Sequence, residues 1–160
     1  MNSKTLIWLL PLLLLAFTAC EPDTACTKRD TTTSMVVTLH ADSIDDIGKQ
    51  YTYTSWDSLR VQGVGSDTIL YSTQALSQLP LELRPDTTVS AFLITYHQQT
   101  DTLCIFHTPQ QHFISLACGC TIYHTIDSVY STDTRVDSIL IINASIETTA
   151  QENIRIYLHE

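Results

Sequence analysis

Cysteine offers the clearest chemistry in this 160-residue chain, and the first of the five cysteines, Cys20, has the most informative surroundings. It follows a short apolar stretch, residues 6–17, which is preceded by a lone lysine and followed by two small residues. This order is typical of a bacterial lipoprotein signal, in which the cysteine becomes the lipidated first residue of the mature protein. A helix that spans a bilayer needs roughly 20 apolar residues, so cleavage is favoured over a permanent anchor. We therefore expect residues 1–19 to be removed and Cys20 to carry lipid.

The other four cysteines, Cys26, Cys104, Cys118 and Cys120, would then lie in an oxidising compartment, where pairing is expected. A bond between Cys118 and Cys120 is disfavoured, because a single intervening residue resists disulfide geometry. Two pairings remain, in which Cys26 joins either Cys118 or Cys120 and Cys104 joins the other. A hairpin centred near His112 would place Cys104 opposite Cys120. This register favours Cys26–Cys118 together with Cys104–Cys120.

A metal site is the alternative use of the same residues. Cys104, Cys118 and Cys120, with His107 or His124 nearby, would offer sulfur and imidazole ligands for copper or zinc. Their spacing is not that of a C-x-x-C pair, and oxidation competes for the thiols of an exported protein. We expect structural disulfides, and neither a metal nor another cofactor.

The sequence contains no pattern with a catalytic mechanism. Ser115 does not lie in the Gly-x-Ser-x-Gly turn of a hydrolase nucleophile, and the six histidines form no His-Glu-x-x-His pair. Adjacent carboxylates such as Asp45 and Asp46 lie in a polar stretch, where solvation explains them. His124, in an alternating apolar segment, is expected to be packed and hydrogen-bonded rather than catalytic. We predict no catalytic residues; the alternative is a small glycan-active enzyme that uses loop carboxylates.

Aspartate is followed by serine or threonine at 10 of its 12 positions, and an apolar residue or threonine follows most of these pairs. Turn chemistry explains most of them, because aspartate forms a turn and serine or threonine then opens a strand. The pattern also resembles the acceptor motif of the general O-glycosylation system of Bacteroidota, which modifies exported proteins. Thr24 and Thr31, close to the N-terminus of the mature chain, are the candidate glycan carriers.

Composition limits the possible partners. Seventeen acidic residues against eight basic ones give a formal net charge of −9, and the basic residues form no cluster. Nucleic-acid binding is therefore disfavoured, as is attraction of the protein surface to acidic lipid headgroups. The expected partners are the membrane, through the N-terminal lipid, and an unknown envelope protein or glycan.

Residues 20–34 are polar and rich in threonine, and they are predicted to tether a single domain, residues 35–160, to the membrane. The domain shows short alternating segments between turn signals, which favours an antiparallel β-sandwich, immunoglobulin-like, with about seven to nine short strands. One stretch, residues 72–79, is the only candidate for a helical turn. The predicted strands are residues 35–41, 58–64, 68–72, 89–96, 102–107, 112–116, 120–126, 137–143 and 153–158.

Several segments in this order resemble the small Bacteroidota lipoproteins classed as domain of unknown function 6452. They are Cys20 with Cys26 close behind, then residues 57–65, 79–83, 101–103, 113–119, 137–143 and 152–157. Cys104 and Cys120 depart from the pattern of the group, which puts a second disulfide in doubt. The resemblance implies no catalytic residue, substrate or cofactor.

Together these features predict a lipid-anchored, non-catalytic binding or assembly module of the cell envelope. We expect it at the outer membrane, with the periplasmic leaflet favoured over the cell surface, because no dense acidic run follows Cys20. The alternatives are a small envelope glycan-active enzyme and a protein that handles copper or zinc.

Overall fold

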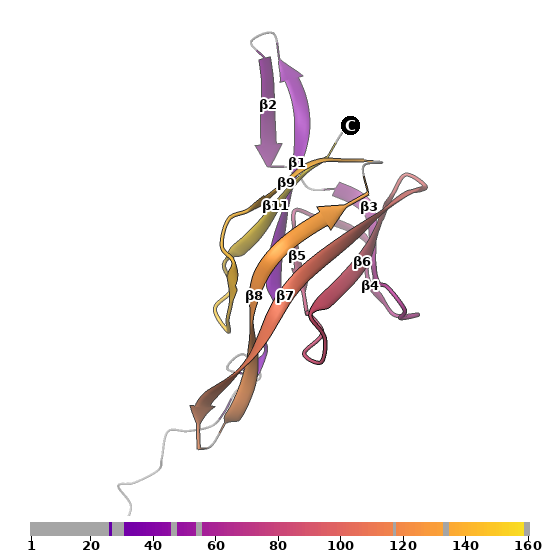
Figure 1. The fold of residues 1–160 in the computed structure, drawn as a ribbon. Coiled ribbons are helices and arrows are strands. Elements are labelled where there is room, and N and C mark those ends of the chain that lie inside the picture. Colours follow the sequence, from indigo (N-terminus) through magenta and orange to yellow (C-terminus); the bar gives the residue numbers. More distant parts are fainter. Residues whose placement is uncertain are drawn as a thin grey trace, which may run out of the picture.

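The computed structural model describes residues 26, 31–45, 48–53, 56–116, 118–132 and 135–158. These residues form eleven strands in two sheets (Figure 1). Residues 1–19, Cys20 and Thr24 lie outside the described ranges. Within those ranges, no helix has the length and apolar character needed to cross a membrane.

The strands follow one another along the chain with short connections. They are β1 (Met35–Asp45), β2 (Gly48–Tyr53), β3 (Trp56–Gly63), β4 (Ile69–Leu76), β5 (Gln78–Leu81), β6 (Val89–Tyr96), β7 (Gln99–Ser115), β8 (Gly119–Ser131), β9 (Val136–Ile141), β10 (Ser145–Ile146) and β11 (Glu152–Leu158).

One sheet has the order β2-β1-β11-β9, and β5 pairs with the first part of β1. β1 and β11 run parallel, with Val37 opposite Ile154 and Leu39 opposite Ile156, whereas the other pairs of this sheet are antiparallel. The strands β1 and β11, which are far apart in the sequence, are therefore neighbours in the sheet. The second sheet is antiparallel and has the order β10-β8-β7-β6-β3-β4.

The core lies between the two sheets and is built from the inward-facing residues of each. In β7 the buried positions alternate with more exposed ones from Asp101 to His107, and Leu103 and Ile105 are fully buried. Ile154 and Ile156 of β11 are equally buried in the other sheet. Full burial of such a side chain stabilises a fold by about 1.5–3 kcal/mol, so this period-two pattern specifies which face turns inward.

The predicted all-β sandwich is confirmed, with more strands than the seven to nine expected. The segments at 102–107 and 112–116 belong to one long strand, β7, and the strands β2, β5 and β10 were not predicted. The predicted helical turn at residues 72–79 is wrong, because this segment forms the end of β4 and the start of β5. β1 begins at Met35.

Asn153 joins three parts of the fold through one buried side chain. Its carbonyl oxygen Oδ1 accepts a hydrogen bond from the backbone N–H of Val36, at 3.0 Å. Its Nδ2 donates to the carbonyl oxygens of Asn143 and Ser145, at 3.0 and 2.8 Å. β1, β11 and the segment that leads into β10 are therefore held by an amide that is 2% exposed.

We predict that Asn153→Ala lowers the free energy of unfolding by about 2–3 kcal/mol, because it leaves buried backbone groups without partners. Urea denaturation followed by circular dichroism measures this change. Thr149→Ala, at an exposed residue of the neighbouring loop, serves as the control and should change stability little. Equal stability of the two variants would contradict the assigned role of the amide.

Candidate functional site

A disulfide between Cys26 and Cys118 joins the N-terminal segment to the end of the β7–β8 hairpin. Their Cα atoms lie 5.1 Å apart, although the two residues are separated by 92 positions in the sequence. This bond is one of the two that the sequence predicts, Cys26–Cys118 and Cys104–Cys120.

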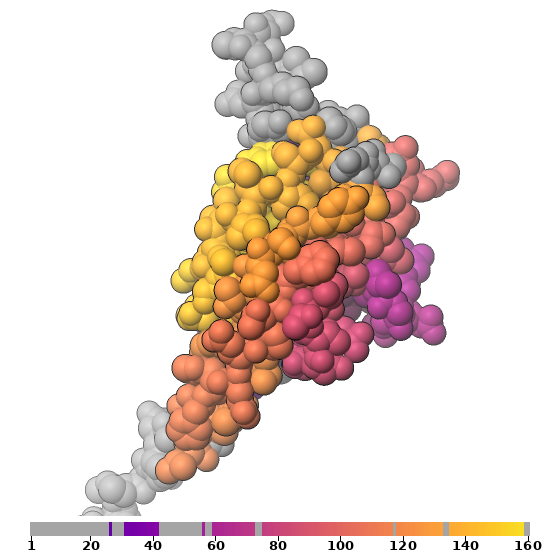
Figure 2. All heavy atoms as spheres, in the orientation of Figure 1, coloured from indigo at the N-terminus to yellow at the C-terminus, as the bar shows by residue number. Residues whose placement is uncertain are grey.

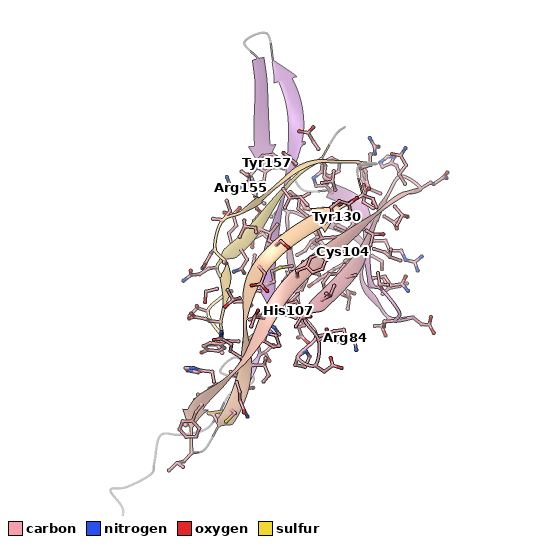
Figure 3. All side chains as sticks on the ribbon, viewed as in Figure 1. Arg84, Cys104, His107, Tyr130, Arg155 and Tyr157 are labelled. Carbon is pink, nitrogen blue, oxygen red and sulfur yellow. A yellow bond between two sulfur atoms is a disulfide. The ribbon has the colours of Figure 1, made fainter. Side chains whose placement is uncertain are left out.

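The predicted Cys104–Cys120 bond is wrong. Cys104 and Cys120 are free, because the register of the hairpin places Cys104 opposite Tyr130 and Cys120 opposite Phe113. The two strands of the hairpin meet between Ser115, where β7 ends, and Gly119, where β8 begins, instead of near His112, and this moves every facing pair by about ten residues. Figure 3 shows Cys104 and Tyr130 in the upper part of the hairpin.

The alternative metal ligands are not brought together either. Cys118 is bonded to Cys26. Cys120 lies opposite Phe113, which is nine residues from Cys104 along β7, a distance of about 30 Å in a strand. Among the described residues, no three histidine, cysteine or carboxylate side chains are grouped so that they could hold a metal ion.

A buried chain of polar side chains runs instead through the six-stranded sheet, from β6 across β7 to β8. Ser90 Oγ lies 2.9 Å from His107 Nε2, and His107 Nδ1 lies 3.1 Å from His124 Nδ1. The backbone N–H of Arg84 donates to Ser90 Oγ at 2.9 Å. His107 lies near the middle of the hairpin, and Arg84 projects from the loop before β6 (Figure 3). We call Ser90, His107 and His124 the histidine relay.

The contact between the two Nδ1 atoms constrains the protons of the relay. Only one hydrogen fits between them, so one Nδ1 donates and the other accepts. At most one of the two rings can therefore be charged while the contact persists. The rings meet edge to face, with centroids 4.8 Å apart.

Burial keeps both rings neutral at pH 7. It lowers the pKa of His124 to about 4, with a further contribution from the neighbouring His107. Burial also lowers the pKa of His107, although the carboxylate of Asp127 acts in the opposite direction. The expectation of a packed, hydrogen-bonded His124 agrees with this environment.

His124 also lines a hollow of about 330 Å³, which we call the threonine hollow. Its other lining residues come from three places: the N-terminal segment, the loop that follows β5, and strand β8. They are Thr31, Thr32, Thr33, Glu82, Leu83, Pro85, Thr121 and Ile122.

The N-terminal wall of this hollow is fixed to β8 by two hydrogen bonds. Thr33 Oγ1 donates to the carbonyl oxygen of Ile122 at 2.8 Å, and Thr121 Oγ1 donates to that of Thr31 at 2.6 Å. The end of the predicted tether is thus part of the folded domain. The glycosylation candidate Thr31 is half-buried at this wall.

A second hollow, of about 400 Å³, lies at the other end of the relay. Ser90 lines it, and Glu82 lines both hollows. The remaining lining residues are Gly63, Val64, Ser66, Leu70, Arg84, Val89, Ala91 and Phe92. The histidine relay therefore connects the walls of two surface depressions.

The relay has the hydroxyl-to-imidazole distance of an activated serine nucleophile. Ser90 is nevertheless only 2% exposed, and its oxygen already accepts from the Arg84 N–H. Among the described residues that line the hollows, Glu82 is the only carboxylate, whereas glycoside hydrolysis ordinarily needs two. The hydrogen bonds of the relay hold His124 in place at the wall of the threonine hollow.

Sequence reasoning identified His124 as a packed residue, named His107 only as a possible metal ligand, and missed Ser90. His107 continues the inward-facing positions of Leu103 and Ile105, and this period-two pattern could have shown that it is buried. Ser90 likewise alternates with the inward-facing Phe92 and Ile94, but its contact with His107 depends on the pairing of β6 with β7.

The model of a family of unknown function, DUF6452, matches residues 58–158. The chain belongs to this family, as its resemblance to the group predicted. No curated protein and no solved structure matches the chain.

We predict that the free energy of unfolding falls as the pH falls from about 6.5 toward 4, because the unfolded chain binds protons that the buried His124 excludes. The contribution of His124 amounts to about 3 kcal/mol over that window. Denaturant unfolding at several pH values measures it.

The variant His124→Asn should reduce this dependence and leave the smaller contribution of His107, whereas His97→Asn, at an exposed turn, should retain the full dependence. Measurements above pH 5 separate the contribution of His124 from that of Glu152, because Arg155 holds the pKa of Glu152 below its usual value. The same slope in both variants would show that His124 is not the responsible group.

Proposed function

We propose that this member of the DUF6452 family is a lipoprotein of the bacterial cell envelope that binds a hydroxyl-rich ligand, an envelope glycan, in the threonine hollow. The supporting observation is the composition of that hollow, which combines threonine side chains, one carboxylate and a histidine ring positioned by the relay. The protein would act as a non-catalytic binding module.

The lining of the threonine hollow favours a neutral polar ligand. Its only formally charged side chain among the described residues is Glu82, which would repel anions and can accept hydrogen bonds from hydroxyl groups. Threonine hydroxyls both donate and accept, and Leu83 and Ile122 add apolar contact. His124 is 3% exposed and its Nδ1 is engaged by His107, so the ring supports the wall of the hollow from behind the threonines.

The location of the protein is inferred from the sequence of its first twenty residues. A lipid on Cys20 would hold the domain at the outer membrane of a Bacteroidota cell, on the periplasmic leaflet in preference to the surface. A disulfide between Cys26 and Cys118 is consistent with an oxidising, exported environment.

We predict that Cys20→Ala abolishes incorporation of an alkyne-tagged fatty acid and releases the protein from the membrane fraction. Cys104→Ala, which removes a free cysteine of the folded domain, should change neither readout. Click labelling and cell fractionation measure the two effects. Fatty acid in the Cys20→Ala protein, or parent protein recovered unlabelled from the cytoplasm, would refute the proposed anchor.

We predict that Glu82→Gln weakens glycan binding about tenfold, because a hydrogen bond to a charged acceptor contributes about 1.5 kcal/mol. The probes are lipopolysaccharide core oligosaccharides and muropeptides, with affinities measured by calorimetry. Glu147→Gln removes the same charge at an exposed position outside the hollow, and it should bind as the parent does.

Equal affinity in both variants would show that the ligand does not contact Glu82. Turnover of these probes that is lost in Ser90→Ala would instead favour the alternative, an enzyme in which the relay is catalytic.

A further inference from the structure

The far half of the β7–β8 hairpin projects beyond both sheets (Figure 1). Figure 2 shows it as a narrow extension from the body of the molecule. β7 has no buried position after His107, and residues 110–113 are exposed. We call residues 112–116 and 118–123 the hairpin tip.

The hairpin tip presents apolar side chains to solvent. Phe113 is 58% exposed and Leu116 is 98% exposed. An apolar residue that is almost fully exposed at the end of a projecting hairpin contributes nothing to the core of its own domain. Such side chains are typical of a surface that meets another apolar phase.

The hairpin tip is also free of formal charge. The chain contains 17 acidic and 8 basic residues, yet none of them lies between Asp101 and Asp127. The acidity that would keep the body of the protein away from a bilayer is therefore absent from the tip. His112 and Tyr123 add a stacked ring pair, with centroids 4.3 Å apart and an interplanar angle of 11°. Amphipathic aromatic rings are enriched at membrane–water interfaces.

The disulfide determines how far the hairpin tip can be from the proposed lipid. Cys26 is bonded to Cys118, and only six positions separate Cys26 from Cys20. Six residues span at most about 20 Å when fully extended. Leu116 is two positions from Cys118, so a lipid on Cys20 would keep the tip within reach of the bilayer surface.

We propose that the hairpin tip is a second membrane contact, in which Phe113 and Leu116 enter the headgroup region of the leaflet that holds the Cys20 lipid. This inference rests on the lipid anchor of the proposed function. The short covalent path to Cys20 and the absence of charge favour a lipid surface over a second copy of the chain. The domain would then contact the membrane at two places, through the acyl chains on Cys20 and through the hairpin tip.

This orientation has a consequence for the threonine hollow. Thr121 and Ile122 belong both to the hairpin tip and to the wall of that hollow. The hollow would therefore lie close to the membrane surface, where the sugars of membrane-attached glycans begin.

The test compares two tryptophans on the same hairpin of the full, lipidated protein. Phe113→Trp places the probe in the tip, and Tyr130→Trp places it at an exposed position about 30 Å away along the strands. Both changes replace one exposed aromatic residue by another. The proteins are reconstituted into phosphatidylcholine vesicles with or without brominated acyl chains. Tryptophan emission is measured in the fraction that floats, after subtraction of the emission of the parent protein, whose core contains Trp56.

We predict a blue shift and loss of emission for Phe113→Trp with brominated lipid, and emission unchanged by bromine for Tyr130→Trp. Adding Leu116→Asp to Phe113→Trp should remove the quenching, because a charge at the tip opposes entry into the headgroup region. Since Leu116 is exposed, this change should leave the fold intact.

Equal quenching of the two tryptophan variants in floated protein would overturn the second contact while leaving the lipid anchor intact. A blue shift without quenching would show that the tip is covered by protein, as in contact with a second copy. Protein that fails to float with the vesicles would refute the anchor itself, and the membrane contact with it.

Discussion

The covalent bond between Cys26 and Cys118 is the constraint on which the candidate site depends. It brings the N-terminal segment to the end of the β7–β8 hairpin, where Thr31 and Thr33 then form hydrogen bonds with β8. These contacts build one wall of the threonine hollow. A cross-link that closes a loop of roughly 90 residues also stabilises a fold by about 4–5 kcal/mol on the chain-entropy model. One bond thus supports the stability of the domain and the shape of its site.

The histidine relay is a second constraint, inside the sheet. Buried polar groups are costly unless they are hydrogen-bonded, and each member of the relay has such a partner. Its geometry requires that β6, β7 and β8 pair in one register, since Ser90, His107 and His124 come from three strands. The relay therefore ties the position of His124 in the hollow to the pairing of the whole sheet.

Local patterns were sufficient to predict the all-β class and most strand positions, because alternation of apolar residues depends only on near neighbours. The Cys26–Cys118 bond was also predicted, through elimination among few cysteines and an expected hairpin. The sequence pattern misplaces this hairpin, because it centres the hairpin near His112 and divides β7 in two, whereas β7 continues to Ser115. Ser90 was missed for a related reason, since contacts across strands depend on register, and register is set by the complete sheet.

The most direct test of this account is mass spectrometry of the native protein, alkylated without reduction and then digested. We predict a peptide that links Cys26 to Cys118, together with alkylated Cys104 and Cys120. A link from Cys26 to Cys120, or four alkylated cysteines, would contradict the account, because the N-terminal segment would no longer be held at Cys118.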